Sequence, residues 1–198
     1  GDDSSPLADY FGWDAHGRIQ VVGRTGDGLG ELSAKRVIDA GGRDVVPGLI
    51  DAHGHVMNLG FALLRANLVG AKDKAELVAR LKAFEKTLPE GAWLLGRGWD
   101  QNDWPGKQFP TAADLDAAFP DRPVWLERVD GHAGWANSAA LRAVKRDLSG
   151  DWQPDGGRIL RSDGRATGIF IDAAAALVDA VVPAPDEALR AQALERSL

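Results

Sequence analysis

The chain has 198 residues, of which 44% are hydrophobic and 26% are charged, and its formal net charge is −6. These proportions are typical of a globular protein with a substantial core, and the acidic balance argues against nucleic acid as a partner. No long uncharged apolar run is present, so we expect no membrane-spanning helix. Because the chain has no cysteine, any metal site must use histidine, carboxylate or modified lysine side chains.

The first fifty residues contain short β-rich runs separated by turns. We predict strands over 17–23, a β-rich run after a turn, and over 36–42, which paired glycines close. From residue 47, apolar runs begin to alternate with helical patterns. The first such run, "LIDAHGH" over 49–55, is typical of a short buried strand.

The next elements follow one another as helix and strand. A helix is predicted over 73–88, because Asp73 and Glu76 form a capping-box pair ahead of an apolar stripe. Strands are predicted over 92–100 and 123–132.

Shorter elements complete the pattern. We predict a short helix over 111–120, a helix capped by Asn137, an irregular stretch over 149–168, a short strand over 168–172, and a last helix that opens at 185.

Alternating strands and helices indicate a parallel sheet with crossover helices. Such sheets place function at the carboxyl ends of their strands. The segments "DAHGH", "GRGWDQND" and "RVDGH" all occupy that position, and they are therefore the first places to look for a site.

His53 and His55 are the strongest candidates for metal ligands. Side chains at i and i+2 of a strand point to the same face, and two neutral imidazoles that converge there suit Zn²⁺ or a similar divalent ion. A His-x-His pair alone is more often just two polar side chains exposed to solvent. The preceding Pro-Gly break and apolar strand favour the metal interpretation.

The segment "PGLIDAHGH" resembles the strand-1 metal motif of the amidohydrolase superfamily, and the run from "LLGRGWDQND" to "VDGHAGWANSAAL", with "GRATGIFIDAA", resembles its YtcJ-like branch, amidohydrolase family 3. The resemblance implies an α/β fold in which residues 1–47 are part of a small β-sandwich domain and residues 48–198 are the first half of a (β/α)8 barrel. It also implies that His53 and His55 are the first two ligands of a divalent metal, with zinc as the first expectation.

The chain departs from this family in length. The family completes its metal site with histidines from strands 5 and 6 and an aspartate from strand 8. His16 and His132 do not occupy such positions. We therefore expect an amino-terminal portion that is inactive alone, with the remainder of the chain or another copy completing the barrel.

Two further residues are candidates for the site. His132, at the end of the third predicted barrel strand, lies beside the substrate in the resembling family, where it could donate a hydrogen bond to a carbonyl oxygen or its oxyanion; the alternative is a loop histidine. Asp172 lies where the family often carries a carboxylate, so it is a candidate metal ligand, and helix capping is an equal alternative. Trp99, Trp104 and Trp135 flank strand ends and could line an apolar pocket, and core packing is the default alternative for each of them.

These features predict a metal-dependent hydrolase in which an activated water attacks the C–N bond of an amide or formamide-like small molecule. Two alternatives remain open. One is a non-catalytic homologue or split subunit that uses the same scaffold for binding. The other is a complete doubly wound binding domain in which the two histidines are incidental.

Overall fold

The computed structural model describes residues 7–25 and 33–198. The chain divides into two compact units, residues 1–51 and 52–198, and each is described by itself. Within the described ranges, every helix is too short or too polar to cross a bilayer.

The described part of the first unit contains a β-hairpin. Strand β1 (Tyr10–Trp13) pairs antiparallel with β2 (Ile19–Gly23), and the carboxylate of Asp14 accepts two backbone N–H groups of the connecting turn. The strand predicted over 17–23 is confirmed. The strand predicted over 36–42 is wrong: the segment pairs with no described strand, and Val37 is 82% exposed. That residues 1–47 belong to a β-sandwich stays a prediction.

The second unit contains a six-stranded mixed sheet in the order β3-β4-β5-β6-β8-β7. Its strands are β3 (Ala66–Asn67), β4 (Leu94–Trp99), β5 (Val124–Arg128), β6 (Ala133–Ala136), β7 (Gly157–Ser162) and β8 (Arg165–Asp172). The pairs β3-β4 and β4-β5 are parallel, whereas β5-β6, β6-β8 and β7-β8 are antiparallel. Three antiparallel pairings argue against a doubly wound parallel sheet.

The parallel part confirms the strands predicted at 92–100 and 123–132, but the second of these ends at Arg128 and a turn separates it from β6. The short strand predicted at 168–172 is the end of the longer β8. The prediction of an irregular stretch over 149–168 is wrong for its second half, because β7 and the start of β8 form a hairpin there.

Six helices connect or flank these strands in the described residues. They are α1 (Val56–Leu63), α2 (Lys74–Glu85), α3 (Ala113–Asp116), α4 (Ser138–Ala143), α5 (Ala176–Asp179) and α6 (Glu187–Ser197), with short 3-10 turns η2 (Gln101–Asp103) and η3 (Ala173–Ala175). Asp73, Asn137 and Asp186 cap α2, α4 and α6, each accepting a backbone N–H three residues ahead. Three predicted helix starts are thereby confirmed.

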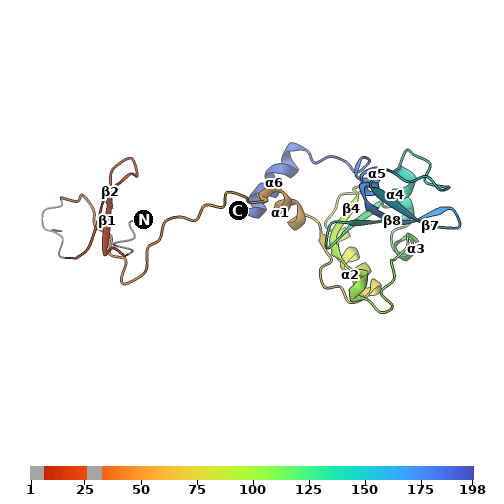
Figure 1. Cartoon of the computed structure of the whole chain (residues 1–198), viewed down its shortest axis with the longest axis horizontal. Coiled ribbons are helices and arrows are strands. Elements are labelled where there is room, and N and C mark those ends of the chain that lie inside the picture. Colours follow the sequence, from red (N-terminus) through yellow and green to blue (C-terminus); the bar gives the residue numbers. More distant parts are fainter. Residues whose placement is uncertain (1–6, 26–32) are drawn as a thin grey trace. The chain divides into compact units, whose positions relative to one another are not determined.

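Helices α1 and α6 lie side by side (Figure 1). Their contact depends on Gly60, because a Cβ built there would lie 2.0 Å from the carbonyl oxygen of Ala193. Small residues on both helices therefore allow the two backbones to approach closely.

The sheet is buried on both faces. Consecutive residues of a strand point to opposite faces, so Leu126 packs in one core cluster with Leu77 and Leu81 of α2, while Trp125 packs in a second cluster with Val178 of α5. Burial on both faces explains why these strands appear in the sequence as continuous apolar runs.

The strand predicted over 49–55 is wrong in this structure. Leu49 is 99% exposed and Ile50 is 91% exposed, and the segment forms no ladder with any described strand. A β-strand needs a neighbour for its backbone N–H and C=O groups, and none of the described strands takes that place. The mixed sheet and its helices form a mixed α/β fold. That this fold is part of a (β/α)8 barrel remains a proposal.

Candidate functional site

One edge of the sheet collects the polar side chains that follow the strands. Strands β4 and β5 are parallel, and β8 runs parallel to β5 because both are antiparallel to β6. The carboxyl ends of β4, β5 and β8 therefore lie at the same edge. "GRGWDQND", "RVDGH" and the end of "GIFID" meet there, as expected for a functional edge.

His132 and Asp172 contact each other directly at this edge. The register of β6 and β8 pairs Ala133 with Ile171, which makes His132 and Asp172 the next cross-strand pair. Nδ1 of His132 lies 2.8 Å from Oδ1 of Asp172, and the backbone N–H of Asp172 donates to the carbonyl oxygen of His132 over 2.9 Å. The structure thus joins two residues that are forty positions apart and that the sequence assigned to different roles.

The turn that carries His132 is held by an ion pair between Arg128 and Asp130. Arg128 donates two hydrogen bonds to Asp130, at 2.9 and 2.7 Å, and Asp130 accepts the backbone N–H of His132 over 3.0 Å. The guanidinium hydrogen bonds from Arg128, with the backbone hydrogen bond from His132, lower the pKa of Asp130. Asp130 therefore remains ionised and fixes the backbone of His132.

His53 and His55 lie together on the segment that enters α1. Their ring centroids are 5.1 Å apart, with an interplanar angle of 78°. A tetrahedral Zn²⁺ that binds two imidazole nitrogens at about 2.0–2.1 Å separates the ring centroids by about 5 Å. The spacing is compatible with a shared divalent ion and is equally that of an edge-to-face contact between two rings, so the metal role of the pair stays a prediction. The pair lies on a loop and a helix start rather than on the predicted strand.

The two pairs do not form one centre in the described part of the chain. Among residues 7–25 and 33–198, no three His, Asp or Glu side chains lie close enough together to hold a metal ion. Asp172 is engaged with His132 and does not join His53 and His55 as a third ligand. Its role as a metal ligand stays a prediction.

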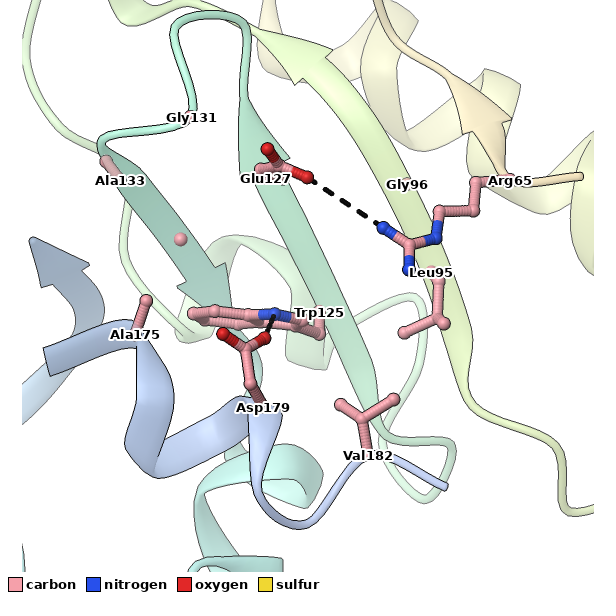
Figure 2. Close-up of a pocket in the computed structure, with 11 residues that line it drawn as sticks. Arg65, Leu95, Gly96, Trp125, Glu127, Gly131, Ala133, Ala175, Asp179 and Val182 are labelled. Atoms are coloured by element: carbon pink, nitrogen blue, oxygen red, sulfur yellow. Dashed lines mark hydrogen bonds and ion pairs between the residues drawn. The ribbon is translucent and has the colours of Figure 1, made fainter. Parts of the chain in front are cut away.

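A pocket of about 240 Å³ lies on the sheet face that packs against α5 (Figure 2). Trp125 forms one wall, and Gly134 makes room for it, since a Cβ there would lie 1.9 Å from the Trp125 ring. Glu127 forms an ion pair with Arg65 over 3.8 Å. Gly131 and Ala133, the neighbours of His132, also line the pocket, so the His132 turn borders it.

The polar residues of this pocket were not predicted. Glu127 bridges Arg65 and Arg97, the latter at 3.3 Å, and the indole N–H of Trp125 donates to Asp179 over 2.9 Å. Arg97, Trp125 and Glu127 lie within the run that resembles the amidohydrolase family, but no functional role was predicted for any of them. Only the position of Arg97 and Glu127 near the carboxyl ends of predicted strands could have suggested them.

Asp179 gives a testable pH dependence. Burial raises the pKa of its carboxyl group, with a smaller contribution from the charge of Glu127, and the Trp125 hydrogen bond only partly opposes this. Because the folded chain holds this proton more tightly than the unfolded chain, stability falls as pH rises through the interval between the two pKa values. Asp179→Asn keeps an acceptor for Trp125, so it should raise the melting temperature by a few degrees at pH 7.

The advantage of Asp179→Asn should shrink as the pH falls below that interval, where the wild-type carboxyl group is neutral as well. Thermal unfolding followed by circular dichroism between acidic and neutral pH measures this difference. The exposed Asp121→Asn is the matched control. A wild-type protein that is more stable than Asp179→Asn at neutral pH would contradict the argument.

The tryptophans predicted to line a pocket belong instead to the core. Trp99 and Trp135 are fully buried and Trp104 is 4% exposed. Each indole N–H donates to a backbone carbonyl group at 2.9 Å, and the three rings contact one another. The structure thus shows the core packing that was the default for these side chains and not the pocket alternative, because flanking a strand end does not decide which way a large side chain packs.

Comparison with solved structures identifies the class of the fold. The chain matches a metal-dependent hydrolase from Pyrococcus furiosus with a TM-score of 0.55 and 27% identity, covering 76% of this chain and 28% of that chain. The mixed sheet is thus one found in metal-dependent hydrolases.

Sequence comparisons give the family. The model of the amidohydrolase family Amidohydro_3 matches residues 36–198, and the chain therefore belongs to this family. YtcJ of Bacillus subtilis (strain 168), an amidohydrolase by name, is 37% identical over 149 residues, which are 74% of this chain and 28% of YtcJ. The N-substituted formamide deformylase of Arthrobacter pascens is 32% identical over 166 residues, 82% of this chain and 30% of that protein. The family resemblance inferred from the motifs is therefore confirmed. The chain spans about three tenths of the length of the curated relatives it matches.

Proposed function

We propose that this chain is the part of a metal-dependent hydrolase that carries the first two metal ligands, and that the hydrolase cleaves the C–N bond of an amide or an N-substituted formamide. The observation that carries the proposal is the His53–His55 pair, whose ring centroids are 5.1 Å apart. Family membership supports hydrolysis, and the formamide deformylase among the relatives supports the choice of bond.

The chain would contribute binding and positioning to this reaction. His53 and His55 would hold a divalent ion, for which we propose zinc, and Asp172 is a candidate for a third ligand or for support of His132. A bound ion of this kind supplies an activated water and polarises the substrate carbonyl group. His132 would contact the substrate, and the pocket beside its turn would receive part of the substrate molecule.

The site also requires ligands and a general base that the described residues do not gather around His53 and His55. We propose that they come from further chain or from a second copy that completes a (β/α)8 barrel. The exposed Leu49 and Ile50 would then become part of its first strand. On this view the 198 residues alone have no hydrolase activity.

The direct test is hydrolysis of an N-substituted formamide by the intact protein as isolated from its source. We expect turnover that a chelator abolishes and that Zn²⁺ or another divalent ion restores. Turnover that is indifferent to chelation would refute the metal-dependent reaction. A protein that binds the ion but turns over no amide or formamide would instead support the second candidate, a binding scaffold without catalysis.

The role of His132 gives a separate prediction. His132→Ala should leave the metal content unchanged and lower kcat/KM by about 10²-fold, since a side chain that contacts the substrate has been removed. Steady-state kinetics and elemental analysis of the same preparation measure both quantities. His16→Ala, an exposed histidine of the first unit, is the control. Loss of the metal from His132→Ala would mean that His132 is a ligand.

A further inference from the structure

Asp172 has a backbone conformation that aspartate rarely adopts. Its φ is 47° and its ψ is −126°, which is close to the second residue of a type II′ turn, at about +60° and −120°, where glycine is strongly preferred. Such a conformation costs roughly 1–3 kcal/mol for a residue with a side chain, and it persists only where the surroundings enforce it. The presence of an aspartate, and not a glycine, at this backbone conformation therefore needs an explanation.

The surroundings of Asp172 fix it on several sides. Its backbone N–H donates to the carbonyl oxygen of His132, its Cα pairs with Gly157 of β7, and the chain turns directly into η3 after it. The strained backbone places its carboxylate 2.8 Å from Nδ1 of His132. Helix capping does not account for the side chain, because Asp172 makes no capping hydrogen bond to η3.

The contact determines which nitrogen of His132 carries the proton. An ionised carboxylate offers only acceptors, so the 2.8 Å contact is a hydrogen bond only when Nδ1 carries the proton. In the neutral ring Nε2 then has no hydrogen and presents a lone pair. The side chain of His132 is 70% exposed, so a ligand can reach this lone pair.

We infer that Asp172 is a positioning residue that holds His132 in the Nδ1–H tautomer, so that Nε2 of His132 accepts a hydrogen bond from the N–H group of the substrate. The inference rests on the proposed function and narrows its substrate class. The substrate would be a secondary amide or an N-monosubstituted formamide, whose nitrogen still carries a hydrogen. A neutral His132 held in this way has no N–H left to donate to a carbonyl oxygen.

The tautomer can be measured without any reaction. In the intact protein labelled with ¹⁵N, two-bond ¹⁵N–¹H correlations of His132 at about pH 9, where imidazole side chains are neutral, should show Nδ1 protonated and Nε2 bare. Asp172→Ala removes the acceptor at Nδ1 and should shift His132 toward the Nε2–H form. Asp163→Ala is the matched control, because Asp163 also has a positive φ, 51°, and lies in the β7–β8 turn.

An Nε2–H or mixed tautomer in the wild-type protein would overturn the inference, and this outcome needs no variant to fold. An unchanged tautomer in a folded Asp172→Ala variant would overturn it as well. Loss of the bound metal from Asp172→Ala, but not from Asp163→Ala, would also overturn it, by making Asp172 a ligand.

The substrate class is tested by comparing N-methylformamide with N,N-dimethylformamide. We expect wild type to favour the first in kcat/KM by about 10-fold or more, as expected for one hydrogen bond. Asp172→Ala should lose this preference. Equal use of both by wild type would refute the N–H contact. If neither formamide nor any other amide is cleaved, both the proposed function and the proposed substrate class are refuted. The tautomer measurement then decides the positioning role by itself.

Discussion

Replacement of Asn137 by alanine is expected to destabilise the chain by about 3–5 kcal/mol, because one fully buried side chain holds four backbone groups. Its Oδ1 accepts the N–H groups of Val124 and Ala140, both at 2.9 Å. Its Nδ2 donates to the carbonyl oxygens of Phe119 and Arg122, at 2.8 and 3.0 Å. Alanine would leave these groups buried without partners and would remove the cap of α4.

Urea unfolding followed by tryptophan fluorescence measures this loss, since the buried Trp99, Trp104 and Trp135 report on the same core. Asn137→Asp should be similarly damaging, because it places acceptors against the two carbonyl oxygens. Asn102→Ala, on an exposed side chain, is the control and should change stability by less than about 0.5 kcal/mol. A loss of only about 1 kcal/mol in Asn137→Ala would mean that the side chain acts as a helix cap alone.

His53→Ala and His55→Ala should each weaken metal binding by more than about 100-fold in the intact protein. Direct ligands dominate the affinity of a site, and even residues that only support a ligand contribute about 10–100-fold. The ring centroids are 5.1 Å apart, so each variant would remove one of two imidazoles that act on the same ion and leave the proposed site short of a direct ligand.

Competition with a chromophoric chelator measures these affinities, and His16→Ala controls for the loss of a histidine as such. The double variant should be little worse than either single variant, because the two ligands act as one unit. If both single variants keep the wild-type stoichiometry and affinity, His53 and His55 are not the ligands.

The elements that could be predicted are those whose signals are local. Helix α2 was predicted because Asp73 and Glu76 mark its start, and the structure shows the expected hydrogen bond from the Glu76 N–H to the Asp73 carboxylate at 2.7 Å. The β7–β8 hairpin also has a local signal that was missed. Asp163 and Gly164 both have positive φ, 51° and 73°, and an Asp-Gly pair between β-rich runs is a strong hairpin signal.

The parts that could not be predicted depend on distant pairing. The run at Leu49 and Ile50 has the composition of a buried strand, but strand formation requires a neighbour, and no described strand supplies one. The contact between His132 and Asp172 is equally non-local, because it follows from the register of β6 against β8. The sequence identified both residues as candidates, yet it contained no signal that they form a pair.

The most direct test of the metal centre is an anomalous difference map from crystals of the intact protein, measured at the absorption edge of the metal found by X-ray fluorescence. The proposed function predicts a single strong peak, or one member of a close pair, within about 2.0–2.2 Å of an imidazole nitrogen of both His53 and His55. A fully occupied metal site elsewhere in the protein, with His53 and His55 both free of metal, would contradict it.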